Sequence, residues 1–197
     1  MGLREQKKSR TRQALAETAF RLFAMRGFDH VTVAEIAAAA GVSEKTVFNY
    51  FPTKEDLFFD EVPDRQRVLA ETIRNREPGE TIVAALRRLQ LADCRRLCTE
   101  GFAVFARIIE DSPALQAKEL EVMSGFVQMV AEVLEGEGVD ERDARIAAGL
   151  LVSVHRQLFR TARKQALAGR HGPPAVRRLR GDLERAYRLL EHGLGTL

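Results

Sequence analysis

The sequence is poor in cysteine and has no long apolar run. Its 197 residues include two cysteines, Cys94 and Cys98, which are too few for a disulfide scaffold. The longest apolar stretch, residues 146–154, is far shorter than the ~20 residues of a membrane-spanning helix. The first residues lack the apolar core of a signal peptide and the sixth-position Ser or Thr of a myristoylation site. We therefore expect a soluble, cytoplasmic protein.

Motifs of common enzyme classes are also missing. The sequence contains no GxSxG elbow, P-loop, GxGxxG fingerprint or metal-binding helix motif. Cys94 and Cys98 are four residues apart on one predicted helix face, but no His or third Cys follows at metal-ligand spacing. Burial as small apolar side chains is therefore the favoured interpretation, and a redox role is the alternative. We expect neither enzymatic activity nor a cofactor or metal.

Charge is distributed unevenly along the chain. Residues 1–26 carry seven basic and two acidic groups, whereas residues 61–154 carry 12 basic and 17 acidic groups. Residues 155–188 carry ten basic groups and two acidic ones, so they hold the largest positive surplus. Such asymmetry is typical of proteins that bind nucleic acid, and it offers two basic segments as candidates.

The spacing of apolar residues is helical along the whole chain. Leu15, Ala19, Leu22 and Phe23 follow the i, i+4, i+7, i+8 pattern of an amphipathic helix that runs from about Lys8 to Gly27. The apolar periodicity, the prolines and the cap residues predict the following further helices: 33–40, 44–50, 54–76, 80–98, 100–110, 113–135, 141–168 and 174–193. The predicted fold class is all-α.

The helices before residue 60 carry explicit cap residues. Thr32 and Glu35 have the spacing of a capping box, and Gly41 ends the helix that they open. Ser43 is a natural N-cap for residues 44–50, and Thr53 caps the helix that follows Pro52. Two short helices with a Gly-containing turn, packed on a longer first helix, form a helix-turn-helix arrangement.

The second short helix has the pattern of a DNA-reading helix. Val47 and Phe51 are four residues apart and face the core, so the opposite side of the helix points outward. That outward surface comprises Glu44, Lys45, Phe48 and Asn49. Thr46 and Tyr50 share a side, and Lys54 in the next helix suits a phosphate oxygen.

The stretch from Val31 to Ala37 and from Gly41 to Leu57 closely resembles the DNA-binding domain of TetR-type transcriptional regulators. Residues 20–28 also resemble the first helix of that family and its exit. The resemblance implies an all-helical homodimer whose N-terminal domain binds operator DNA and whose C-terminal domain binds a small ligand. It further implies a repressor that the ligand releases from DNA, because most proteins of this type are such repressors.

The family pattern also assigns roles to individual residues. It implies that Thr32, Thr46, Tyr50 and Lys54 contact the phosphate backbone and that Ser43 starts the reading helix. It implies that the groove is read by Glu44, Lys45, Phe48 and Asn49. Phe48 replaces the usual Tyr, which favours apolar contact with a thymine methyl group over a hydroxyl contact. Glu44 could accept from cytosine N4 or repel phosphate.

The last two predicted helices have apolar seams for helix–helix packing. Family resemblance in position suggests that both pair with their symmetry mates in a four-helix dimer interface. The predicted interface residues are Leu150, Val154, Leu158, Leu179, Leu183 and Leu190. The basic residues lie mostly off these seams, so a second DNA surface there is the lesser alternative, and His155 has a structural or interface role.

Large apolar side chains of the middle region could line a ligand pocket, although such residues more often form a core. The predicted pocket residues are Phe102, Phe105, Met123, Phe126, Met129 and Phe159.

We thus expect a DNA-binding domain in residues 1–52 and a helical ligand-binding and dimerisation domain in residues 53–197. The expected partners are a pseudo-palindromic double-stranded operator, a second copy of the chain and an unidentified small molecule, with no membrane. The alternative functions are a helical protein–protein interaction module without DNA binding and a small helical enzyme.

Overall fold

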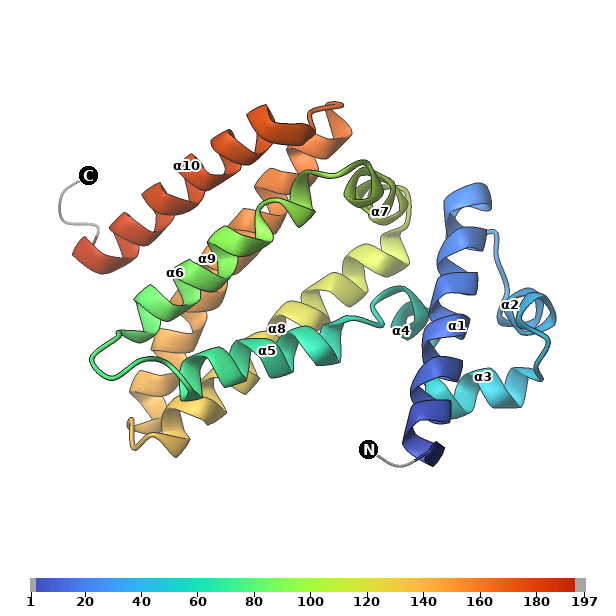
Figure 1. The fold of residues 1–197 in the computed structure, drawn as a ribbon, viewed down its shortest axis with the longest axis horizontal. Helices are drawn as coiled ribbons and strands as arrows, with labels where there is room; N and C mark the ends of the chain where they lie inside the picture. The colour runs from blue at the N-terminus through green and yellow to red at the C-terminus, as the bar shows by residue number, and fades with distance from the viewer. Residues whose placement is uncertain (1–2, 194–197) are drawn as a thin grey trace. The chain divides into compact units, whose positions relative to one another are not determined.

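The computed structural model describes residues 3–193, and it describes side chains from Glu5 onward. The helices are α1 (Leu3–Arg26), α2 (Val33–Ala40), α3 (Glu44–Tyr50), α4 (Lys54–Phe58), α5 (Val62–Arg74), α6 (Ile82–Asp93), the 3-10 helix η1 (Arg96–Cys98), α7 (Glu100–Glu110), α8 (Pro113–Gly136), α9 (Glu141–Leu167) and α10 (Gly172–His192). No strand occurs among the described residues, and the predicted all-α class is confirmed (Figure 1).

Three predicted helix boundaries were wrong. The helix predicted over residues 54–76 is two helices, and Pro63 lies at the second position of α5, where its missing N–H costs no helical hydrogen bond. The helix predicted over residues 80–98 ends at Asp93 and is followed by η1. The first helix begins at Leu3 rather than near Lys8, because residues 3–12 contain no glycine or proline and are rich in helix-forming side chains.

The chain forms two compact units. The first contains the described residues through Val62 together with residues 107–118, and the second contains residues 63–106 and 119–193. Packing thus extends the first unit beyond residue 52, where we predicted the boundary between functional domains. Helices α7 and α8 each contribute residues to both units.

The first unit is built around α1, against which α2 and α4 pack. A cluster of phenylalanine rings forms its centre, with centroids 4.8 Å apart for Phe23 and Phe28 and 6.3 Å apart for Phe23 and Phe58. Such aromatic pairs add stability beyond their buried area. Leu15, Ala19 and Phe23, which belong to the predicted amphipathic stripe, are buried.

The segment 107–118 joins the first unit through buried and polar contacts. Leu115 is fully buried, and the Ser112 hydroxyl donates a hydrogen bond of 2.8 Å to the Asp29 carboxylate. Lys118 forms an ion pair of 3.2 Å with Asp56 in α4. The corner between α7 and α8 is therefore part of the unit that contains the helix-turn-helix.

The second unit is a packing of long helices. Helix α10 lies along α9 and also packs against α6, while η1 contacts both α9 and α10 (Figure 1). Small buried residues of α9, among them Ala144, Ala148 and Ala162, allow the helices to approach closely. Tyr187 of α10 is the largest fully buried side chain.

Candidate DNA-binding site

Helix α2 is held at both ends by hydrogen bonds between residues close in sequence. The Thr32 hydroxyl accepts a hydrogen bond of 3.2 Å from the Glu35 N–H, and the Glu35 carboxylate accepts one of 2.8 Å from the Thr32 N–H. The Thr32 backbone and then the Arg26 guanidinium lower the pKa of Glu35 to about 2. Gly41 ends the helix in the left-handed conformation, with φ of 68°. The predicted capping box and the predicted helix end are confirmed.

Helix α3 buries one face in the first unit. Its N-cap is Ser43, whose Oγ accepts a hydrogen bond of 3.2 Å from the Thr46 N–H. Val47 and Phe51 are 1% and 0% exposed, as their spacing predicts. Because these two side chains anchor the helix, its opposite face is fixed in orientation.

The opposite face of α3 carries the four side chains predicted to read the groove. Glu44, Lys45 and Asn49 are exposed, and the Phe48 ring is 48% exposed although it is apolar. Within the described part of the chain, none of the four makes a hydrogen bond, an ion pair or a ring contact. The face therefore presents a cation, a carboxylate, an amide and an apolar ring to a partner, which is the chemistry of base-edge recognition.

The residues predicted to contact phosphate lie around this face. Thr46 and Tyr50 are half-buried on α3, and the Thr46 hydroxyl lies 2.9 Å from that of Ser43. Thr32 is exposed at the start of α2. A phosphate at the N-terminus of α2 or α3 would meet hydroxyl groups and the first backbone N–H groups of a helix.

Lys54 has a structural role that its sequence position does not reveal. Its ammonium donates hydrogen bonds of 3.0 Å to the carbonyl oxygens of Phe28 and Val31 and lies 4.1 Å from the centre of the Phe28 ring. It thereby fixes the loop between α1 and α2. Since an ammonium has three N–H groups, one remains for a phosphate oxygen.

Arg12 also has a role that the sequence did not indicate. This arginine belongs to the basic N-terminal segment and lies within α1. Its guanidinium donates to the carbonyl oxygens of Tyr50 at 3.0 Å and Asp60 at 3.2 Å, and it lies 4.2 Å from the centre of the Phe51 ring. Arg12 thus fixes the C-terminal end of α3, and only contacts between distant residues reveal this.

In the second unit, four of the six predicted pocket residues gather around His155. The ring centroids are 5.8 Å apart for Phe102 and Phe105 and 6.3 Å apart for Phe102 and Phe159. The His155 ring lies 4.9 Å from Phe159 and 5.2 Å from Phe126. The remaining two predicted residues are half-buried on α8, and they are Met123 and Met129.

His155 is the polar group of this aromatic cluster. It is 6% exposed, and its Nδ1 atom has no hydrogen-bond partner within the described part of the chain. Burial lowers its pKa to about 4, against a smaller opposing effect of Asp93. At neutral pH, the cluster therefore contains an uncharged imidazole with an unused polar atom.

The predicted dimer residues differ widely in exposure. Val154, Leu158, Leu179 and Leu183 are buried within the chain's own second unit. Leu190 is half-buried, whereas Leu150 is 54% exposed and lies one helical turn from Ile146, which is 64% exposed. The predicted seams therefore pack mainly within one chain, and α9 retains an exposed apolar face.

The two cysteines are buried thiols. Burial raises the pKa of Cys94 to about 11, and burial also raises the pKa of Cys98. Because the thiolate is the reactive form, neither thiol is activated for redox chemistry. Among the described residues, no group of three metal-ligating side chains occurs, and no helix is long and apolar enough to cross a membrane.

The capped helix pair, its exposed reading face and the helical second unit define the class of protein: a helix-turn-helix transcriptional regulator. The pattern described as "Bacterial regulatory proteins, tetR family" matches residues 15–60. The transcriptional regulator TcmR of Streptomyces glaucescens is 30% identical over 151 residues, which cover 71% of this chain and 67% of TcmR. The chain belongs to the tetR family of bacterial regulatory proteins, whose members are DNA-binding, ligand-responsive repressors.

Solved structures share the fold over nearly the whole chain. NalD, the secondary repressor of the MexAB-OprM multidrug efflux pump in Pseudomonas aeruginosa, has a TM-score of 0.56 at 21% identity and covers 92% of this chain and 97% of its own. FadR of Thermus thermophilus, a repressor solved in complex with lauroyl-CoA, has a TM-score of 0.52 at 28% identity. That match covers 93% of this chain and 94% of FadR.

Proposed function

We propose that this protein is a dimeric repressor that binds a pseudo-palindromic operator through α3 and is released by a small molecule bound in its second unit. The observation that carries the proposal is the exposed face of α3, which Val47 and Phe51 anchor from behind. An exposed face held on a rigid base suits the readout of base edges in a major groove.

Lys45 and Asn49 are the residues we assign to base recognition. A lysine can donate to guanine O6 or N7, and an asparagine can form two hydrogen bonds with adenine. Phe48 would contact a thymine methyl group, and Glu44 would accept from cytosine N4. We assign backbone contacts to the hydroxyl-bearing and basic residues around this face, namely Thr32, Ser43, Thr46, Tyr50 and Lys54.

The test of DNA binding uses Asn49, since Lys54 also stabilises the fold. An electrophoretic shift with the DNA upstream of the protein's own gene should show a specific complex. Asn49→Ala should change the base preference and cost about 1–3 kcal/mol on the preferred operator. The matched control is Arg177→Ala, which removes an exposed charge from α10.

Two outcomes would contradict the DNA-binding proposal. If Asn49→Ala left the base preference unchanged, α3 would not be the reading helix. If the full chain bound no DNA in a salt-sensitive manner, a helical protein–protein interaction module would replace the repressor.

We assign dimerisation to the exposed face of α9. Ile146 and Leu150 are large apolar side chains in contact with solvent. A side-chain carbon added at Gly149 or at Gly181 in α10 would meet no atom within 4 Å. A glycine within a helix costs about 1 kcal/mol relative to alanine, and its benefit is that a second helix can approach closely.

Sedimentation of the full chain tests this assignment. The double variant Ile146→Asp/Leu150→Asp should be monomeric at concentrations where the wild type is a dimer. Leu120→Asp is the control, because Leu120 is 65% exposed but lies on α8. A monomeric wild type, or equal dissociation of both variants, would overturn the assignment. In the dimer, two copies of α3 would read half-sites about 34–36 Å apart.

We assign the effector to the aromatic cluster around His155. Apolar rings with a single unused polar atom are suited to an apolar small molecule that carries one hydrogen-bonding group. FadR was solved with lauroyl-CoA, so acyl-CoA thioesters belong in the first screen. Ligands that raise the melting temperature should also release the operator, and His155→Phe should weaken only those with a polar group.

Helices α7 and α8 offer a path from the effector to the reading helix. Each contributes residues to the aromatic cluster or its surroundings and also to the corner that Ser112 and Leu115 hold in the first unit. A ligand that shifts these helices would therefore act on the first unit without an additional element. A coupling of about 1–3 kcal/mol is typical of such effectors.

A further inference from the structure

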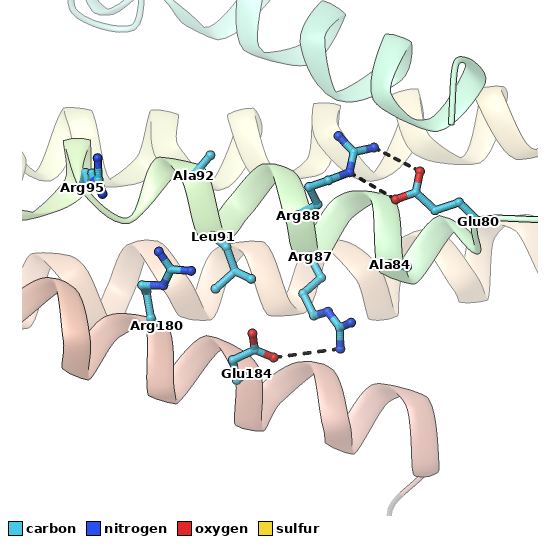
Figure 2. A pocket seen from close by; sticks show the side chains of 9 residues that line it. All are labelled: Glu80, Ala84, Arg87, Arg88, Leu91, Ala92, Arg95, Arg180 and Glu184. Atoms are coloured by element: carbon cyan, nitrogen blue, oxygen red, sulfur yellow. Dashed lines mark hydrogen bonds and ion pairs between the residues drawn. The ribbon is translucent and has the colours of Figure 1, made fainter. Parts of the chain in front are cut away.

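A groove of about 670 Å³ lies between α6 and α10 in the second unit, and it shares no residue with the aromatic cluster. Figure 2 shows that Arg87 and Arg88 extend from α6 and Arg180 from α10, while Arg95 lies just beyond the end of α6. The Leu91 side chain lies between the two helices. Volumes of 300–1,000 Å³ are typical of sites for small molecules. The groove is therefore large enough for a metabolite, and its charges determine which class of metabolite it suits.

Two of its four arginines already have carboxylate partners. Arg88 donates to both carboxylate oxygens of Glu80, at 3.2 and 3.0 Å, and this pairing lowers the pKa of Glu80. Arg87 lies 3.9 Å from Glu184 (Figure 2). It also lies 3.5 Å from Glu191. One end of the groove is thus close to neutral.

The other end holds an uncompensated positive charge. Arg95 and Arg180 are exposed, and neither makes a hydrogen bond or an ion pair within the described part of the chain. They come from opposite sides of the groove and lie at the same end of it in Figure 2. The charge of Arg180 also lowers the pKa of Cys94, the residue directly before Arg95, although burial outweighs this effect. Two guanidinium groups without a partner in the described part of the chain therefore lie at one end of the groove.

We infer that the groove between α6 and α10 binds a phosphate-bearing small molecule, with the phosphate between Arg95 and Arg180. A phosphate monoester carries about −1.5 to −2 charge, which matches the two unpaired cations. Its three terminal oxygens can accept hydrogen bonds from two guanidinium forks, whereas a carboxylate has oxygens for one fork. The rest of the molecule would lie over Leu91 and reach Glu80 and Glu184, whose oxygens accept from hydroxyl groups.

Isothermal titration of the full-length protein with inorganic pyrophosphate tests this site. The buffer contains no phosphate, and the salt concentration is about 0.15 M so that loosely attracted ions are screened. The wild type should show saturable binding of one pyrophosphate per chain. The double variant Arg95→Gln/Arg180→Gln should bind about tenfold more weakly or worse.

The matched control is Arg177→Gln/Arg178→Gln, which removes two exposed arginines of α10 that do not line the groove. Its affinity should stay within about twofold of the wild type, because surface charges act weakly at a distance. Circular dichroism melting checks that each variant folds. The melting temperature should stay unchanged, because the four substituted arginines are exposed and have no partner within the described part of the chain.

Three outcomes would overturn the inference. The first is the absence of saturable pyrophosphate binding. The second is an equal loss in both double variants, which would indicate general attraction to a basic surface. The third is citrate binding as tight as that of pyrophosphate, which would identify a general anion site or a docking site for acidic side chains.

Discussion

The two compact units differ in how they treat buried polar groups. In the first unit, the buried polar side chains Thr18 and Ser112 both have hydrogen-bond partners. In the second unit, four buried side-chain atoms have no partner within the described part of the chain. These atoms belong to Gln90, His155, Gln165 and Tyr187.

This difference corresponds to different tasks. A buried polar atom without a partner costs about 1–3 kcal/mol, so a unit that contains four is less stable than its packing allows. The first unit must hold α3 in one orientation, and a unit whose buried polar groups are all hydrogen-bonded favours a single structure. The second unit retains unused hydrogen-bonding capacity, and a ligand that supplies partners would stabilise it. Four variants test this comparison, from the largest expected effect to the smallest.

Phe51→Ala should have the largest effect, because it removes a fully buried ring beneath the Arg12 guanidinium. We expect a loss of about 3–5 kcal/mol in the free energy of unfolding and the loss of operator binding. Urea unfolding followed by circular dichroism measures the first, and an electrophoretic shift measures the second. Phe159→Ala, in the half-buried part of the aromatic cluster, should cost about 1–2 kcal/mol. If both variants lost the same free energy of unfolding, the distinction between a rigid first unit and an adaptable second unit would not hold.

His155→Phe should change the pH dependence of stability. Burial lowers the pKa of His155 from 6.5 to about 4, so the unfolded chain binds a proton more readily than the folded one. As the pH falls from 6.5 to 4, the wild type should therefore lose up to about 3 kcal/mol of stability relative to the variant. Above pH 6.5 the difference should be constant. Urea unfolding at several pH values measures it.

His30→Phe is the control for this measurement, because it removes an exposed histidine of the first unit. Its unfolding curve should follow that of the wild type through the same pH range. A wild type as insensitive to pH as His155→Phe would show that the imidazole gains a partner or solvent in solution, and the contrast between the units would weaken.

Lys54→Met should act on stability and on DNA binding together. The variant keeps the apolar part of the side chain but removes the ammonium that donates to the carbonyl oxygens of Phe28 and Val31. The Phe28 oxygen keeps another donor, the Val31 N–H at 3.2 Å, so the Val31 oxygen is the one left unsatisfied. We expect a loss of about 1–3 kcal/mol in the free energy of unfolding. Binding to operator and to unrelated DNA should weaken by the same factor, since a phosphate contact carries no base preference. A selective loss on the operator would contradict the phosphate contact, and an unchanged free energy of unfolding would contradict the structural role.

Ser112→Ala should have the smallest effect on stability, about 1 kcal/mol, because it removes the hydrogen bond to Asp29 and a long one of 3.4 Å that the hydroxyl accepts from the Leu115 N–H. Its more informative effect should be on coupling. Operator affinity without ligand and ligand affinity without DNA should change little, while the ligand should release the operator less completely. Fluorescence anisotropy of labelled operator, titrated with ligand, measures this directly. If the ligand released the operator from the variant as completely as from the wild type, the α7–α8 corner would not couple the ligand to α3.

The local features of the first unit could be predicted from the sequence. Caps depend on residues three positions apart, so the capping box of Thr32 with Glu35 and the N-cap Thr53 were identified correctly, as was the burial of Val47. Contacts between distant residues could not be predicted. The hydrogen bonds of Lys54 span 26 and 23 residues and those of Arg12 span 38 and 48.

The second unit was harder to interpret for the same reason. Its apolar periodicity identified the helices and the phenylalanines that cluster, but periodicity cannot tell packing within a chain from packing between chains. Leu179 and Leu183 were therefore assigned to a dimer interface although they are buried in the chain's own core. The clustering of His155 with the predicted pocket residues depends on how α8 and α9 pack, and no local pattern encodes it.

The separation of the two faces of α3 has an evolutionary consequence. Within the described part of the chain, Glu44, Lys45, Phe48 and Asn49 make no hydrogen bond, ion pair or ring contact, whereas Val47 holds the helix from the other side. Substitutions at exposed positions of this kind change the free energy of unfolding by about 0.5 kcal/mol or less. If these residues read the operator as proposed, a gene duplicate could drift toward a new operator through these four codons while the protein continued to fold, so its target could diverge faster than its structure.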